Sequence, residues 1–252
     1  MAKQFWKGSA QLSPLPPTLV TCGTLEKPNV LTVAWTGIVA THPPMTYISL
    51  RKSRFSYDII KDSGEFVINM PVSKMCRIVD YCGVKSGKDI DKIKECNIAL
   101  EEAKTVSAPV ISESPVSLEC KVKQLIDCGS HTMFLSEINC VAVDERYIDK
   151  NGKLNLSDSS LLAFAHGEYY EIGTKIGTFG YSVRKKKKRK AKNCAAASRR
   201  LFCILFKILF SSFLKNTTAP VMSPFEITGA APIAFALKLS VDSKHSFSSS
   251  QQ

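Results

Sequence analysis

The densest group of side chains that could hold a ligand lies in residues 51–57, which read Arg-Lys-Ser-Arg-Phe-Ser-Tyr. Cationic and hydroxyl groups alternate here just before a stretch with helical character, and Ser56 is a typical residue for a helix start. Free backbone N–H groups and the helix macrodipole favour a phosphate at such a point. The glycine spacing of a P-loop or dinucleotide fold is missing, so side chains and the helix start would hold the anion.

A second group of interest is the apolar run 30–40, which predicts a largely buried strand with Trp35 near its middle. A phosphate site beside this strand indicates a nucleotide-like cofactor. Each feature also has a structural interpretation. Trp35 could belong to the core, the two arginines at 51 and 54 could lie in a solvated loop, and Ser56 could only cap the helix. Capping and phosphate contact are compatible, because both use the same helix start.

The elements that must position these residues are mostly strands. Strands are predicted at 17–23, 30–40, 45–51, 65–70, 115–127, 132–143 and 160–172, and helices at 56–62, at 72–82 and, more weakly, near 90–104. The pair Pro43-Pro44 marks a corner, because proline cannot donate within a ladder. Many strands with few short helices predict a mainly β fold, an antiparallel barrel or sandwich with helical covers.

Charge divides the chain into two parts. Residues 1–183 carry 20 Lys and Arg against 20 Asp and Glu, so the net charge of +12 lies entirely in residues 184–252. A nucleic-acid partner is therefore not expected for the first part. We predict one domain over residues 1–183 and a basic and apolar low-complexity tail over 184–252.

The tail has several interpretations, which the sequence leaves open. The basic run at 185–190 precedes a 14-residue apolar stretch at 201–214 that contains Lys207 and is too short to span a bilayer. It could be a membrane-surface anchor, a nuclear or nucleic-acid-binding segment, a disordered tail, or a non-native extension arising from a frame slip in the lysine run.

Cysteine usage favours a reducing compartment. The nine cysteines include no C-x-x-C pair, and no Cys/His group has the spacing of a metal site, so no metal is expected. The odd count and the absence of an apolar segment near the start predict a cytoplasmic protein.

Several motifs together resemble the flavin reductase-like, FMN-binding family, which includes the flavoredoxins. The resemblance covers residues 1 to about 183 and rests on the strand from Asn29, the Thr-His-Pro-Pro corner at 41–44, the basic loop at 51–57, Glu-Phe-Val-Ile-Asn at 65–69, Tyr-Cys-Gly-Val-Lys-Ser-Gly-Lys-Asp at 81–89, Gly-Ser-His at 129–131 and Phe-Ala-His-Gly-Glu-Tyr-Tyr at 164–170. It implies a split β-barrel that binds FMN at a homodimer interface.

The resemblance also implies which residues bind the cofactor. They are Asn29, Trp35, Thr36, Arg51, Ser53, Arg54, Ser56, Lys88, His131 and Phe164. His131 is in addition the candidate catalytic residue. The family often has Gly-Asp-His where this chain has Ser130 before His131, so a carboxylate that could orient the imidazole is missing. Without the resemblance, His131 would be assigned to the surface and Lys88 to an exposed ion pair with little effect on stability.

The predicted function is that of an FMN-dependent oxidoreductase working as a homodimer. Electrons would pass from NAD(P)H, as a co-substrate, or from a small redox protein through FMN to a flavin or another acceptor. One alternative is an FMN-carrying electron-transfer protein without NAD(P)H activity of its own. Another is a membrane-tethered scaffold whose functional part is the tail.

Overall fold

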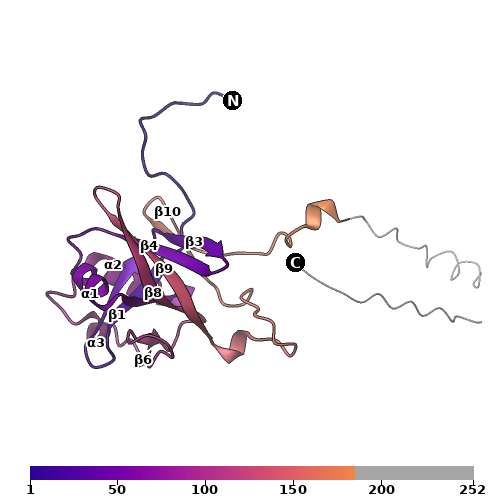
Figure 1. Cartoon of the computed structure of the whole chain (residues 1–252). Helices are drawn as coiled ribbons and strands as arrows, with labels where there is room; N and C mark the ends of the chain where they lie inside the picture. The colour runs from indigo at the N-terminus through magenta and orange to yellow at the C-terminus, as the bar shows by residue number, and fades with distance from the viewer. Residues whose placement is uncertain (185–252) are drawn as a thin grey trace, which may run out of the picture. The chain divides into compact units, whose positions relative to one another are not determined.

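The computed structural model describes residues 1–184 of the 252-residue chain. Within them a compact unit spans Met1–Phe179 (Figure 1). The interpretations of the tail fall on residues outside this described part, apart from Arg184, and the predicted domain boundary at 183 stays a prediction. Among the described residues, no helix is long and apolar enough to cross a membrane.

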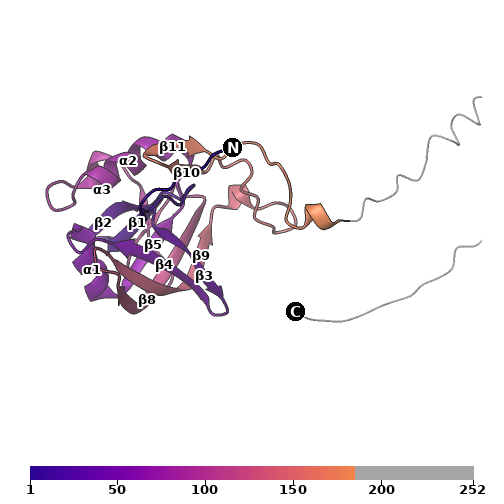
Figure 2. The ribbon, with the colours of Figure 1, turned by 90° about the horizontal axis from the view of Figure 1, so that it is seen from above.

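One antiparallel sheet of seven strands forms the body of this unit, in the order β2-β1-β5-β8-β9-β4-β3. The strands are β1 (Thr18–Gly23), β2 (Pro28–Val33), β3 (Thr36–Thr41), β4 (Pro44–Leu50), β5 (Glu65–Asn69), β8 (Val116–Asp127) and β9 (Thr132–Val143). The long hairpin of β8 and β9 runs through the centre of the sheet (Figures 1 and 2). Each observed strand end lies within two residues of the predicted one for the strands predicted at 17–23, 45–51, 65–70, 115–127 and 132–143, so these predictions are confirmed.

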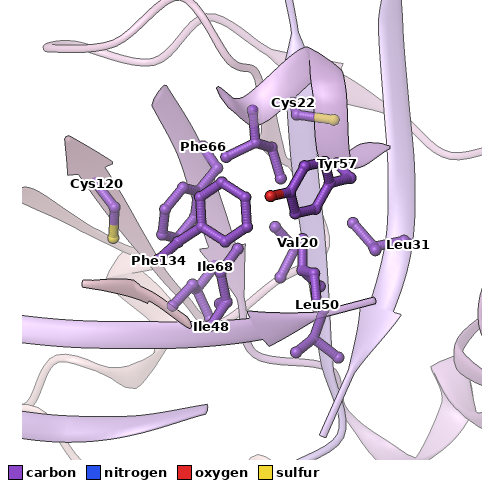
Figure 3. Packing of buried hydrophobic residues seen from close by; sticks show 12 residues of the cluster. Val20, Cys22, Leu31, Ile48, Leu50, Tyr57, Phe66, Ile68, Cys120 and Phe134 are labelled. Carbon is purple, nitrogen blue, oxygen red and sulfur yellow. The ribbon is translucent and has the colours of Figure 1, made fainter. Parts of the chain in front are cut away.

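The sheet curls round on itself. Its two outer strands, β2 and β3, are consecutive in the chain and are joined only by Ala34 and Trp35. The Ser49 amide of β4 donates to the Trp35 carbonyl at 2.9 Å, which extends the pairing of β3 with β4 to the short link between the two outer strands. Side chains from β1, β2, β4, β5, β8 and β9 meet in one buried cluster inside the curl (Figure 3). The predicted mainly β fold is therefore confirmed.

The prediction of one strand over 30–40 is wrong. The chain leaves β2 after Val33 and starts β3 at Thr36, because it crosses from one outer strand of the sheet to the other. Trp35 lies at this break with 42% of its surface exposed, and Ile38 and Val39 on β3 are 65% and 54% exposed. An apolar run predicts burial, but it does not tell which of its residues lie at a break between strands.

Three α-helices accompany the sheet: α1 (Phe55–Ser63), α2 (Cys76–Val84, preceded by the 3-10 turn η1, Ser73–Met75) and α3 (Lys92–Glu95). Helix α2 packs on the outer face of β1 and β2 (Figure 2). The weak helix predicted near 90–104 is wrong beyond α3. Asn97 adopts a left-handed conformation (φ 51°), which ends the helix. Two short strands follow, β6 (Leu100–Glu101) and β7 (Val110–Ile111).

The last predicted strand, 160–172, is a hairpin. Strands β10 (Leu162–Ala165) and β11 (Glu168–Glu171) pair across a turn at His166 and Gly167, whose φ values are 50° and 90°. Glycine supplies this conformation without strain, so the chain reverses there. Short 3-10 turns, η2 (Glu145–Tyr147) and η3 (Tyr181–Val183), complete the described elements.

Candidate functional site

Two neighbouring cavities of 390 Å³ and 160 Å³ lie along β2, and the two together are called the groove here. The two cavities share Leu31, Thr32, Arg51 and Arg54 in their walls. The larger cavity, called here the basic end, is lined by Arg51, Ser53, Arg54, Ser56, Gly83, Lys85, Ser86, Gly87 and Lys92, among others. The smaller one, the aromatic end, adds Trp35 and His131.

The basic end is built on the start of α1. The loop after β4 brings Arg51, Ser53 and Arg54 to this point, and Arg54 is the extended N-cap residue (φ −73°, ψ 134°). The Tyr57 amide of the first turn donates to the Arg54 carbonyl at 2.9 Å, but Arg54 provides no side-chain capping bond, so the start of α1 keeps capacity for an anion. The Arg54 Nη1 atom donates to the Gly83 carbonyl at 3.2 Å, which holds the guanidinium against α2.

Ser56 does not cap the helix, contrary to the structural interpretation of the sequence. The helix begins one residue earlier than predicted, at Phe55. Ser56 is buried, and its hydroxyl accepts a hydrogen bond from Asn29 Nδ2 at 2.5 Å. Asn29 is itself buried in β2 and also contacts the Cys22 sulfur. This buried pair links strand β2 to helix α1 behind the groove wall.

Lys92 is the functional candidate that sequence reasoning missed. It is buried, it lines the basic end, and its Nζ atom donates to the carbonyls of Cys82 and Lys85 at 3.3 Å and 3.2 Å. Burial lowers the pKa of Lys92, because it disfavours the charged form. The one sequence signal near Lys92 is Asp91, the residue before it, which caps α3 and so marks Lys92 as the start of a helix. Lys88, chosen from the sequence, is exposed and lies outside both cavities as described.

Gly87 lets the loop after α2 lie very close to Asn29 and Phe55 in the wall of the basic end. A Cβ atom at Gly87 would lie 2.1 Å from Asn29 Oδ1 and 2.9 Å from Phe55 Cδ1, distances that no side chain tolerates. The loop after α2 can therefore pass directly over the Asn29–Ser56 pair only because this residue has no side chain.

Trp35 and His131 form the aromatic end. Their ring centroids are 4.6 Å apart and the planes are inclined at 34°. The Ser130 hydroxyl lies 2.9 Å from His131 Nδ1, so a hydroxyl occupies the position next to the imidazole where the resemblance leads one to expect a carboxylate. Burial, followed by the positive charges of Arg51 and Arg54, lowers the pKa of His131. The lowered pKa favours the neutral form of the imidazole.

An ion pair connects the loop before α1 with the turn that precedes His131. Lys52, in the basic loop, contacts Asp127 at the end of β8 at 2.6 Å. The other Asp127 oxygen accepts from the Gly129 amide at 2.8 Å, and Gly129 adopts φ 81° in the turn before His131. Both partners are exposed, so the pair contributes little to stability. It does join the loop that carries the arginines to the turn that carries His131.

Two other predicted residues, Thr36 and Phe164, lie outside the groove. The Thr36 hydroxyl donates to the Tyr47 carbonyl at 2.6 Å, within the pairing of β3 with β4. Phe164 lies on β10, where it pairs with Leu15 and packs on Tyr169 at a centroid distance of 5.3 Å. Both residues lie outside the two described cavities. The structure thus brings together Trp35, Arg51, Ser53, Arg54, Ser56 and His131, with Asn29 directly behind them.

The donor set fits a ligand with a phosphate at one end and a flat ring at the other. Guanidinium, ammonium and hydroxyl groups with a helix start are the groups that bind phosphate. The exposed Trp35 ring offers a face for stacking. Among residues 1–184 no cluster of His, Cys, Asp or Glu could hold a metal ion.

Comparison with known proteins places the chain in a family. Residues 11–173 match the model of the flavin reductase like domain, so the chain belongs to this family. Flavoredoxin of Desulfovibrio vulgaris (Miyazaki F) is 30% identical, with a TM-score of 0.67, over 73% of this chain and 100% of that one. Flavoredoxin from Methanosarcina acetivorans is 26% identical with a TM-score of 0.65 over the same shares. An uncharacterized protein of Archaeoglobus fulgidus is 31% identical over 63% of this chain and 88% of its own.

These likenesses agree with the resemblance found in the motifs. The fold is that of the split-barrel proteins of this family, and the relatives that share it are flavoproteins. The family assignment therefore rests on the sequence and on the fold together.

Proposed function

We propose that this protein is an FMN-dependent oxidoreductase that binds FMN along the groove on β2. The phosphate lies at the basic end and the flavin ring at the aromatic end. The observation that carries the proposal is that the two cavities share part of their walls, since Arg51 and Arg54 line both the basic end and the cavity of Trp35 and His131.

In this proposal the protein binds the cofactor and controls its surroundings. FMN, when bound, carries the hydride and electron chemistry. Arg51, Arg54 and Lys92 balance the phosphate charge, and Trp35 packs against the ring. His131 lies at the ring end, where its imidazole can donate or accept one hydrogen bond or proton.

We further propose that the protein works as a homodimer. Trp35 at the aromatic end is an exposed apolar side chain, and so are Ile38 and Val39 on the outer strand β3, which starts directly after Trp35. A second copy against this side would bury them and exclude water from the ring. Lys88 and Phe164, which lie outside the groove of their own chain, are then candidates for contacts with the cofactor of the partner. Sedimentation equilibrium of the wild type and of Ile38→Lys tests this, because the charge would weaken such a dimer.

The test of function is an anaerobic visible spectrum of the full chain after incubation with FMN and removal of free flavin. We expect a yellow protein whose flavin bands bleach on addition of NADH or NADPH. Trp35→Ala and the matched surface variant Trp6→Ala show whether the bound flavin uses this groove, since Trp6 is exposed in the N-terminal arm. A protein that stays colourless in excess FMN contradicts the proposal.

A second function is favoured by the similarity to the two flavoredoxins. The protein would then hold FMN as an electron carrier and exchange electrons with a protein partner. In the same experiment its flavin bands would persist with both nicotinamides and bleach only with dithionite.

A further inference from the structure

Arg51 and Arg54 serve two cavities at once. Both line the basic end and the aromatic end, so the same pair of positive charges acts on an anion at one end and on His131 at the other. In the structure these charges lower the pKa of His131, after burial, which has the larger effect. An anion between the arginines would compensate the charges that disfavour the imidazolium.

The other groups around His131 do not offset the effect of the two arginines on its pKa. Ser130, beside Nδ1, is neutral, and Trp35 contributes a ring without charge. Asp127 at the base of the turn forms an ion pair with Lys52 at 2.6 Å. The positive charge of Lys52 offsets the effect of the Asp127 carboxylate on the imidazole. Cys128, next to the turn, is exposed, and its amide donates to the His131 carbonyl. The two arginines are therefore the charges to which His131 is most sensitive among the described residues.

We propose that a dianionic phosphate group bound at the basic end increases the proton affinity of His131, so that the two ends of the groove are electrostatically coupled. The inference rests on the proposed function, because the flavin phosphate is the anion concerned. It goes beyond that function, because it makes the phosphate an effector of the chemistry at the ring end as well as an anchor.

The coupling discriminates between flavins. A flavin with a phosphate would increase the fraction of His131 that is protonated, and so the positive charge beside the ring, where negative charge forms on reduction. A flavin without a phosphate, such as riboflavin, would place no anion at the basic end and would leave the proton affinity of His131 unchanged. Linkage makes the effect reciprocal, so protonation of His131 strengthens anion binding by the same factor.

Sulfate tests the coupling without any flavin. It remains a dianion from pH 5 to pH 8, so its own titration cannot imitate the effect. The C–H resonances of the imidazole rings are followed by NMR through a pH titration of the full chain, in sodium sulfate and in sodium chloride at equal ionic strength. The His131→Asn variant assigns the signal, and His42 and His166, both exposed, provide internal references.

We expect the titration midpoint of His131 to be higher in sulfate by about half a pH unit or more, the size of a charge interaction over several ångströms near a protein surface. In Arg51→Gln the midpoint should already be higher in chloride, and the sulfate effect should shrink. Lys61→Gln is the matched control, since it removes an exposed positive charge of α1 that lies outside the groove lining.

A His131 midpoint that is equal in sulfate and chloride overturns the coupling. Uptake of FMN is measured on the same sample at pH 7. If FMN binds while the midpoint does not respond, the coupling fails and the proposed function stands. If the midpoint does not respond and FMN does not bind, both fail together.

Discussion

The rings of Trp35 and His131 lie 4.6 Å apart, although one residue stands at the break between β2 and β3 and the other at the turn of the β8–β9 hairpin. Strand β4 produces this contact, because the Trp35 carbonyl accepts from the Ser49 amide and Ser49 pairs with Met133, two residues after His131. Two ring systems from distant parts of the chain thus define one wall of the groove. The contact joins the strongest candidate for ring stacking to the candidate catalytic residue.

Removal of the Trp35 ring should weaken flavin binding far more than folding. Trp35→Ala loses an aromatic contact of about 1 kcal/mol beyond its buried area, so the Kd for FMN should rise about tenfold. Trp35→Phe should recover most of this. The melting temperature of the apoprotein should change little, because 42% of the side chain is exposed. Fluorescence titration of FMN and a thermal melt give both numbers, and an unchanged Kd in Trp35→Ala would exclude this residue from the site.

Gly87→Ala should damage the wall of the basic end. The new methyl group would collide with Asn29 Oδ1 and Phe55, and relief requires a shift of the loop or of the Asn29–Ser56 pair. Overpacking of this kind costs about 1–3 kcal/mol. We expect a lower melting temperature and weaker FMN binding.

Gly173→Ala is the matched control for this substitution. A Cβ atom at Gly173 meets open space, and its backbone is outside the left-handed region. Its melting temperature and Kd should equal those of the wild type. Equal values for Gly87→Ala would show that the loop is free to move away from Asn29.

Local chemistry explains why much of the site could be predicted. The cationic and hydroxyl residues of 51–57 and the start of α1 are close in sequence, so their meeting needs no knowledge of the fold. The β8–β9 hairpin was predicted because its alternating residues and tight turn are also local. The family resemblance added Trp35 and His131, which no local pattern connects.

Long-range packing explains what the sequence did not predict. Lys92 reaches the groove because the short helix α3 turns its ammonium toward the last carbonyls of α2, and no spacing rule encodes that contact. The predicted continuous strand through Trp35 failed for a similar reason. Residues within a strand and residues at a break between two strands can be equally hydrophobic. Only the way the sheet closes determines where the break between β2 and β3 falls.

Lys92→Met should separate ligand binding from stability. The ammonium is a buried positive charge at the basic end, and loss of a charged hydrogen bond to phosphate costs about 1.5–3 kcal/mol, so the Kd for FMN should rise tenfold or more. The lowered pKa of Lys92 shows that burial disfavours its charge in the folded chain. Methionine removes that cost but also leaves the Cys82 and Lys85 carbonyls without their donor, so the two effects oppose each other and the melting temperature of the apoprotein should change much less than the Kd. Lys94→Met, two residues away and exposed, should change neither quantity.

The pH dependence of the site should respond to Ser130. In the wild type, burial and the arginines lower the pKa of His131, and the neutral Ser130 hydroxyl beside Nδ1 does not offset them. Ser130→Asp places a carboxylate there, which favours the imidazolium and raises the pKa of His131. NMR titration of His131 should show the midpoint moving upward in Ser130→Asp, and any step in FMN affinity that follows this protonation should move with it.

Ser130→Ala distinguishes a charge effect from a steric one. It removes the hydroxyl without adding charge, so its His131 midpoint should stay below that of Ser130→Asp. The free imidazole would then lose the partner that selects which nitrogen faces the groove. If Ser130→Asp and Ser130→Ala gave the same midpoint, the residue before His131 would have no electrostatic influence on it, and burial together with the arginines would set the protonation state of the ring end.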